Sequence, residues 1–355
     1  MQRVGHFGRG RGTHGGTRTS RREPRWLADA RAVGHPTALR GLRRARRGCP
    51  IGTKRYRELV SEHRRTFLSQ KDFTSIASRG FNAVRLTVPW YVFGDAGPDS
   101  GPFVGCLEYV DEAFMWAEDI DLKIVLALAV IPGSKASGTD FAHDREDFSR
   151  RRETMLVVLG ALAKRYSLRM ALAGIEVADG VVAQVRRGLT LSDGVPLHQV
   201  RNYYREAYES IRTNAPDVTV ILPDAGAPGS WRRFMPPRRY KNVWLDSHLY
   251  HYRDHIDSVG PTGIRMLSNA SRESMRLARK SGFPVMVGKW SASLPFPDSA
   301  TTPEGRIALE RVYISEQLAI FKSCPAWFFN TWKTDKHLDG WDARVALSSF
   351  ERAML

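Results

Sequence analysis

The sequence of 355 residues predicts an α/β fold, the (β/α)8 TIM barrel, on three observations. From about residue 57 onward, short apolar runs rich in β-branched residues alternate with longer amphipathic stretches. The short runs are continuously apolar, which is typical of parallel strands covered on both faces by helices. No glycine-rich phosphate-binding turn follows any of them, so a doubly wound nucleotide-binding sheet is disfavoured.

Seven strands are predicted from the apolar runs, at residues 81–88, 122–130, 172–177, 218–222, 243–249, 284–288 and 326–332. Six helices are predicted between them, at residues 69–79, 106–119, 145–166, 197–213, 268–281 and 303–322. The first helix begins with Ser69 followed three residues later by Asp72, which is the spacing of a capping box. A closed barrel needs an eighth strand, so the first strand is missing or lies before residue 81.

Residues 1–56 form a basic head that differs in composition from the barrel at 57–355. The first 50 residues hold 13 arginines, no lysine and two acids, so most of the net charge of +17 lies there. We expect the head to be disordered, because it offers too little apolar surface to offset the loss of chain entropy. An RNA-binding tail is one alternative, and the out-of-frame product of a GC-rich gene is another.

Composition also limits the cofactors and partners. No run of about 18 apolar residues and no signal sequence is visible, so we expect a cytoplasmic protein without a membrane partner. Cys49, Cys106 and Cys324 lie far apart, without the spacing of a disulfide framework or a zinc site, and we expect neither a metal nor a cofactor. Because the charge is confined to the head, we expect no nucleic-acid partner, and we expect a monomer.

Catalytic residues of such barrels lie on the loops at the carboxyl ends of the strands. Three segments there, at 84–93, 246–250 and 287–295, resemble family 5 glycoside hydrolases, especially the exo-β-1,3-glucanase branch. Further similar segments follow in the same order along the chain, at 63–67, 72–82, 101–105, 132–134, 174–176 and 327–334. The resemblance therefore extends from about residue 63 to the C-terminus, and it implies a β-linked glucan or oligosaccharide as the ligand.

The resemblance also implies a retaining mechanism with two glutamates, an acid/base after the fourth strand and a nucleophile at the end of the seventh. At the acid/base position this sequence has Gly180, preceded by Asp179, and at the nucleophile position it has Lys289. A glycine cannot transfer a proton, and an ammonium cannot form a glycosyl ester. The leading interpretation is a pseudoenzyme or carbohydrate-binding remnant with no intact catalytic pair.

Other positions of the cleft are divided between lost and retained residues. A cleft histidine of the family aligns with Ala129, and the tryptophan that floors the first sugar site aligns with Asn330. The retained residues, implied to bind substrate, are Arg85, Trp90, His248, Tyr250, Trp290 and Trp332. Each also has a structural interpretation: interior hydrogen bonds for His248 and Tyr250, core packing for the tryptophans, and for Arg85 a turn toward Asp179 or another acid.

Two other functions stay open at this stage. The chain could be a retaining β-glucan or β-glucoside hydrolase with residual activity, in which Asp179 serves as the acid/base. In the third hypothesis Lys289, with its pKa lowered by Arg85 and burial, forms a Schiff base as in barrel aldolases.

Overall fold

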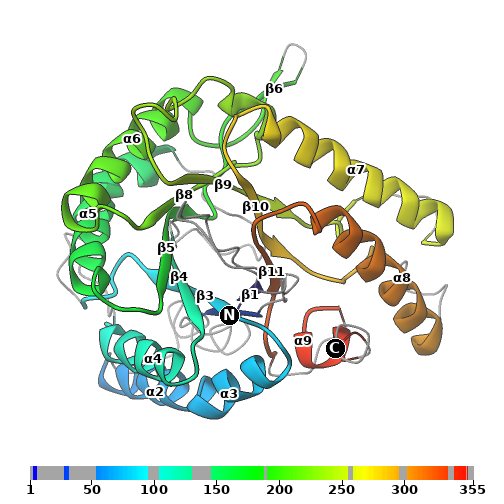
Figure 1. Cartoon of the computed structure of the whole chain (residues 1–355), viewed down its shortest axis with the longest axis horizontal. Helices are drawn as coiled ribbons and strands as arrows, with labels where there is room; N and C mark the ends of the chain where they lie inside the picture. The colour runs from blue at the N-terminus through cyan, green and yellow to red at the C-terminus, as the bar shows by residue number, and fades with distance from the viewer. Residues whose placement is uncertain are drawn as a thin grey trace, which may run out of the picture.

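The computed structural model describes residues 3–5, 28–31, 53–94, 104–129, 145–187, 190–254, 259–295, 302–334, 340–348 and 350. These residues form a closed barrel with helices around it (Figure 1). The strand order around the barrel is β1-β11-β10-β9-β8-β5-β4-β3-β2, and all neighbouring pairs from β2 to β11 are parallel. The predicted fold class is therefore confirmed.

All seven predicted strands are present, and each end lies within two residues of its expected place. They are β3 (Ala83–Pro89), β4 (Lys123–Ala129), β5 (Leu172–Asp179), β8 (Thr219–Pro223), β9 (Val243–Leu249), β10 (Val285–Trp290) and β11 (Trp327–Asn330). Strand β3 is buried along its whole length. Because successive side chains of a strand point to opposite faces, Arg85 and Thr87 lie inside the barrel while Val84, Leu86 and Val88 face the helices.

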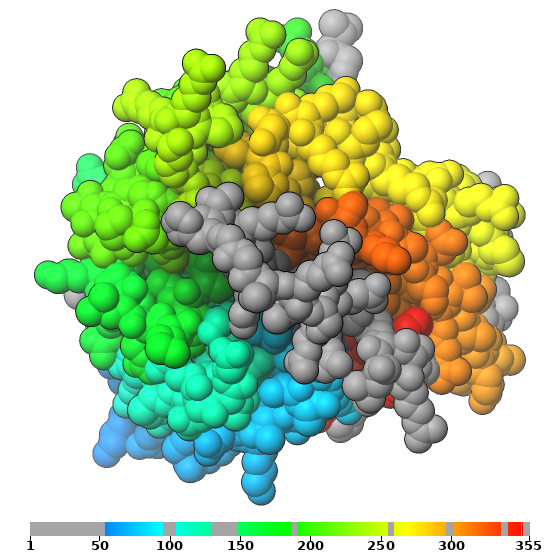
Figure 2. Space-filling view, in the orientation of Figure 1, coloured from blue at the N-terminus to red at the C-terminus, as the bar shows by residue number. Residues whose placement is uncertain are grey.

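The helices alternate with the strands and follow one another around the rim in chain order (Figure 2). The predicted ones are α3 (Gln70–Ser78), α4 (Leu107–Asp119), α5 (Arg145–Tyr166), α6 (Leu197–Asn214), α7 (Pro261–Arg279) and α8 (Pro303–Phe321). Helix α7 begins seven residues before its predicted start, because a proline is well tolerated in the first turn of a helix. None of the described helices is long and apolar enough to cross a membrane.

The expected capping box at the start of α3 is present, and it also ties this helix to the end of β11. The Ser69 backbone N–H donates to Asp72 Oδ2 at 2.9 Å. Asp72 also accepts the indole N–H of Trp332 at 3.0 Å and the ammonium of Lys333 at 2.8 Å. One carboxylate therefore joins the first predicted helix to the last strand and helps to hold the barrel closed.

Some elements were not predicted. They are α2 (Thr53–Phe67), the hairpin strands β6 (Arg186–Arg187) and β7 (Thr190–Leu191), η1 (Pro228–Trp231) and α9 (Ala343–Ala346). The head also contributes β1 (Arg3–Gly5) and β2 (Ala28–Arg31). Strand β2 pairs in parallel with β3, and β1 pairs antiparallel with both β2 and β11.

The sequence left open whether the first strand is missing or lies before residue 81, and in the structure two short segments of the head take its place. The edges of β3 and β11 present backbone N–H and C=O groups, which a short extended segment can pair with whatever its side chains are. Two strands of three and four residues fill the place expected for one parallel strand. The predicted disorder of the head lies outside the described residues, and the helix at Thr53 begins before the predicted boundary at residue 57.

Candidate active site

A buried network of charges links β3 to β5 inside the barrel. The Nε of Arg85 donates to Glu176 Oε2 at 2.6 Å, and its guanidinium lies 3.4 Å from Asp179 Oδ1. Thr87 donates from Oγ1 to Asp179 Oδ2 at 3.3 Å. The sequence left open whether Arg85 would turn toward an acid, and in the structure it contacts two of them.

Lys289, at the end of β10, completes this network from the opposite side of the barrel. Its Nζ donates to Asp179 Oδ1, and the two side chains are 1% and 3% exposed. The position implied for a nucleophilic carboxylate thus holds an ammonium paired with an acid from β5. An ammonium in such a pair has no lone pair with which to attack a carbonyl carbon, so the contact gives no support to the Schiff-base hypothesis.

The backbone at Gly180, the position implied for the acid/base, is left-handed. Its φ is +92°, a region that side chains other than glycine rarely adopt. Asp179, the neighbouring acid, has its carboxylate held by Lys289, Arg85 and Thr87. The local geometry therefore suits glycine and fixes the nearest carboxylate among cations.

Two more buried acids are Asp246, within β9, and Asp224, directly after β8. His248 Nε2 lies 3.0 Å from Asp246 Oδ2, and Asp246 Oδ1 accepts the backbone N–H of Gly288 at 2.5 Å. A Cβ at Gly288 would lie 2.0 Å from Asp246 Oδ2, so only glycine leaves room for this carboxylate. Asp224 accepts the hydroxyl of Ser247 at 2.7 Å. Neighbouring strands thus bring two further buried carboxylates to the same end of the barrel.

The pKa values of two of these acids are raised. Burial raises the pKa of Glu176 to about 7; the Arg85 charge opposes this rise, and the Asp246 and Asp179 carboxylates add to it. Burial also raises the pKa of Asp224 to about 6, against the lowering effect of the hydrogen bond from Ser247.

Two retained residues, His248 on β9 and Tyr250 directly after it, make polar contacts at the carboxyl ends of the strands, which are called the mouth of the barrel below. The His248 side chain is 22% exposed. The Tyr250 hydroxyl accepts a hydrogen bond from Asn330 Nδ2 at 2.7 Å, and its ring lies 5.7 Å from that of Trp341. Both have interior hydrogen bonds, as their structural interpretation predicts, and both keep polar atoms at the strand ends.

The three tryptophans implied to bind sugar are buried in contacts with other side chains. Trp290 is fully buried against Phe321, Trp327 and Phe329, because the residue after inward-facing Lys289 must face the helices. Trp332 is bound to Asp72 as described above. The guanidinium of Arg151 covers the ring of Trp90 at 4.7 Å. The prediction that these rings stack on sugars is corrected for all three.

Sequence reasoning missed three members of this cluster: Thr87, Asp224 and Asp246. It also assigned no role to Glu176. A signal was present, because acids lie in the second half of β5, in the middle of β9 and directly after β8, and these three strands are adjacent in the sheet. The carboxyl ends of parallel strands share one edge, which is why these side chains meet.

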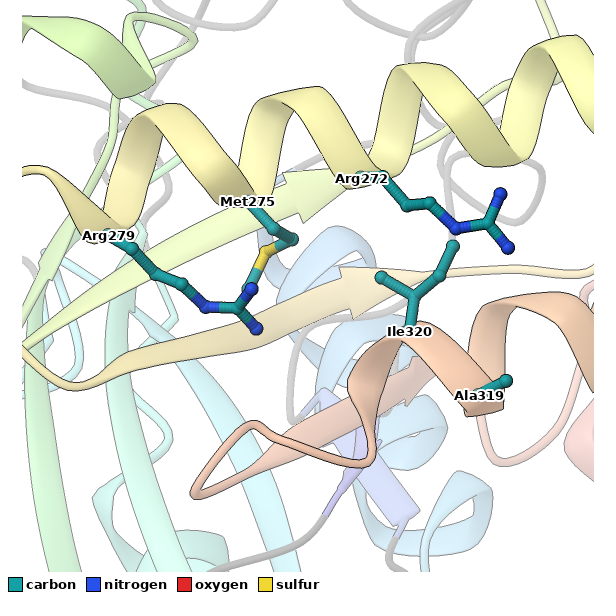
Figure 3. A pocket seen from close by; sticks show the side chains of 5 residues that line it. All are labelled: Arg272, Met275, Arg279, Ala319 and Ile320. Atoms are coloured by element: carbon teal, nitrogen blue, oxygen red, sulfur yellow. The ribbon is translucent and has the colours of Figure 1, made fainter.

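A separate hollow of about 190 Å³ lies on the surface between α7 and α8. Figure 3 shows Arg272, Met275 and Arg279 of α7 facing Ala319 and Ile320 of α8. It is lined by residues of the outer helices, so it is not part of the charged cluster inside the barrel.

Comparison with known proteins gives a family match. Residues 46–302, more than half of the chain, match the model of Cellulase (glycosyl hydrolase family 5). A probable glucan 1,3-beta-glucosidase A of Emericella nidulans is 26% identical over 351 residues, covering 84% of this chain and 80% of that protein. The protein of the same name from Aspergillus clavatus is 27% identical and covers 84% and 77%.

Solved structures agree on the fold. The rutinosidase of Aspergillus niger superposes with a TM-score of 0.61 at 17% identity, over 83% of this chain and 84% of that one. At this identity the likeness concerns the barrel alone.

Proposed function

Because the chain belongs to glycosyl hydrolase family 5, we propose that the mouth of its barrel is directed at β-linked glucan. The relatives that support this are named as glucan 1,3-beta-glucosidases and are similar to this chain over 84% of its length. Polar atoms of His248, Tyr250 and Asn330 at the strand ends are suited to hydrogen-bond sugar hydroxyls.

We propose further that this mouth binds glucan without cleaving it by the family's mechanism. That mechanism needs two carboxyl groups about 5–5.5 Å apart, one as acid/base and one as nucleophile. The resemblance assigns these roles to Gly180 and Lys289. The observation that carries the proposal is the buried Lys289–Asp179 ion pair, which puts a cation in place of the nucleophile and occupies the acid nearest to the acid/base position.

Hydrolysis is the second candidate, and the names of the relatives favour it more directly than they favour binding alone. The mouth retains four buried carboxylates, Glu176, Asp179, Asp224 and Asp246. Burial raises the pKa of Glu176, which favours the protonated form that a general acid needs. In this hypothesis Asp179 acts as the acid/base.

A hydrolysis assay on an aryl β-glucoside and on laminarin separates the two candidates. We expect no release of aglycone or reducing sugar above the background of the buffer. Turnover that persists through purification and disappears in Asp179→Asn, with an unchanged circular dichroism spectrum, would establish the hydrolase instead. Asp217→Asn is the matched control, because Asp217 is an exposed aspartate outside the barrel.

A further inference from the structure

Three side chains from two strands converge inside the barrel. Glu176 of β5 and Asp246 and His248 of β9 each offer one ligand atom, and these atoms all lie within 4.8 Å of one another. Glu176 and Asp246 are fully buried, whereas His248 reaches the partly exposed edge of the mouth.

One oxygen in this cluster lacks the partner that buried polar atoms normally have. Glu176 Oε2 is bound by Arg85, but Oε1 is buried without a hydrogen-bond partner among the described residues. An unsatisfied buried polar atom is costly, and native structures usually provide a group, a water or an ion that satisfies it. The side chain that carries this oxygen faces Asp246 and His248.

We propose that Glu176, Asp246 and His248 bind one divalent transition-metal ion. Two carboxylates and an imidazole suit ions such as Zn²⁺ and Mn²⁺ rather than Cu⁺ or Ca²⁺. The 3.0 Å between His248 Nε2 and Asp246 Oδ2 is close to the separation of neighbouring ligands on an ion with bonds of about 2.0–2.2 Å. Three protein ligands leave further coordination positions for water or a sugar hydroxyl.

The surroundings orient these ligands as a second shell does in metal sites. Arg85 fixes one oxygen of Glu176, and the backbone N–H of Gly288 fixes Oδ1 of Asp246. Each carboxylate thus has one oxygen held by the protein and presents the other to the cluster.

The experiment is a calorimetric titration of chelator-treated full-length protein with ZnCl₂ and, separately, with MnCl₂ at pH 8 without glucan. We expect one ion per chain for at least one metal. Glu176→Gln and His248→Gln should each weaken binding by about tenfold or more. Because no glucan is present, this result is independent of the proposed function.

His198→Gln is the matched control, because His198 is an exposed histidine of α6 far from the cluster in sequence. Its affinity should equal that of the unmodified protein. Absence of binding by both metals would overturn the proposal. Binding that is unchanged in His248→Gln would overturn it as well, and this variant serves if Glu176→Gln does not fold.

Discussion

Removing the charge of Lys289 should destabilise the barrel strongly. In Lys289→Met the carboxylate of Asp179 stays buried without the ammonium that binds it. Removing one partner of a buried pair typically costs about 3–5 kcal/mol. Asp179 keeps Arg85 at 3.4 Å and Thr87 at 3.3 Å, so we expect the lower end, about 3 kcal/mol.

Thermal unfolding followed by circular dichroism measures this effect. In a domain of this size about 1 kcal/mol corresponds to about 2 °C, so Tm should fall by about 6 °C. Removing both charges in Lys289→Met/Asp179→Leu should restore most of that loss, because apolar replacement of a whole buried pair is often neutral or stabilising. A double variant that melts as low as the single variant would refute the reasoning.

Lys123→Met is the matched control. Lys123 binds Asp121 at 2.8 Å, but its side chain is 32% exposed and that of Asp121 is 72% exposed. Exposed pairs of this kind contribute under about 1 kcal/mol. A fall in Tm for Lys123→Met equal to that for Lys289→Met would mean that burial of the pair is not the cause.

Three further expectations concern single positions. Gly180→Ala should lower the free energy of unfolding by about 1–2 kcal/mol in a denaturant titration, because φ is +92° there, whereas Gly229→Ala, with its nearest contact at 3.8 Å, should be neutral. Burial raises the pKa of Asp342, but hydrogen bonds from Arg344 and a backbone N–H outweigh burial and lower this pKa overall. The Asp342 carboxylate therefore stabilises the fold above its ordinary pKa, and this stabilisation is lost as the pH falls through the lowered pKa. Asp342→Asn should flatten the acid side of a plot of Tm against pH. Trp290→Phe should leave laminarin affinity unchanged in calorimetry, since the ring packs away from the mouth; a tenfold loss would return it to the binding site.

The strands and most helices could be predicted because their signal is local. Helix α5 occupies residues 145–166 as predicted, and β9 residues 243–249. The start of α7 was missed because residues 261–267 include a proline and a glycine, and packing of Ile264 and Leu267 against Tyr313 of α8 helps to make them helical. The sequences of β1 and β2 show no strand pattern and did not predict them. Their pairing is determined instead by the open edges of the neighbouring strands β11 and β3.

The candidate site was predictable only in part. The resemblance pointed to Lys289, Gly180 and Asp179. It could not predict the ion pair between Lys289 and Asp179, because these residues are 110 positions apart and meet only in the folded barrel. Trp290 was wrongly assigned to the substrate site. Side chains alternate along a strand, so Trp290 must point to the opposite face from its neighbour Lys289. The acids of β8 and β9 were missed because each is a single aspartate, and only their neighbourhood in the sheet makes them a cluster.

Calorimetric titration with a laminari-oligosaccharide, followed by chromatography of the same sample, tests the central claim most directly. We expect saturable binding, weakened in Tyr250→Ala, and an oligosaccharide recovered at its original length after prolonged incubation. Shortened products that are absent in Asp179→Asn would contradict the claim that a mouth with the Lys289–Asp179 pair binds glucan without hydrolysing it. A lack of binding would contradict the proposal that the mouth is directed at β-linked glucan.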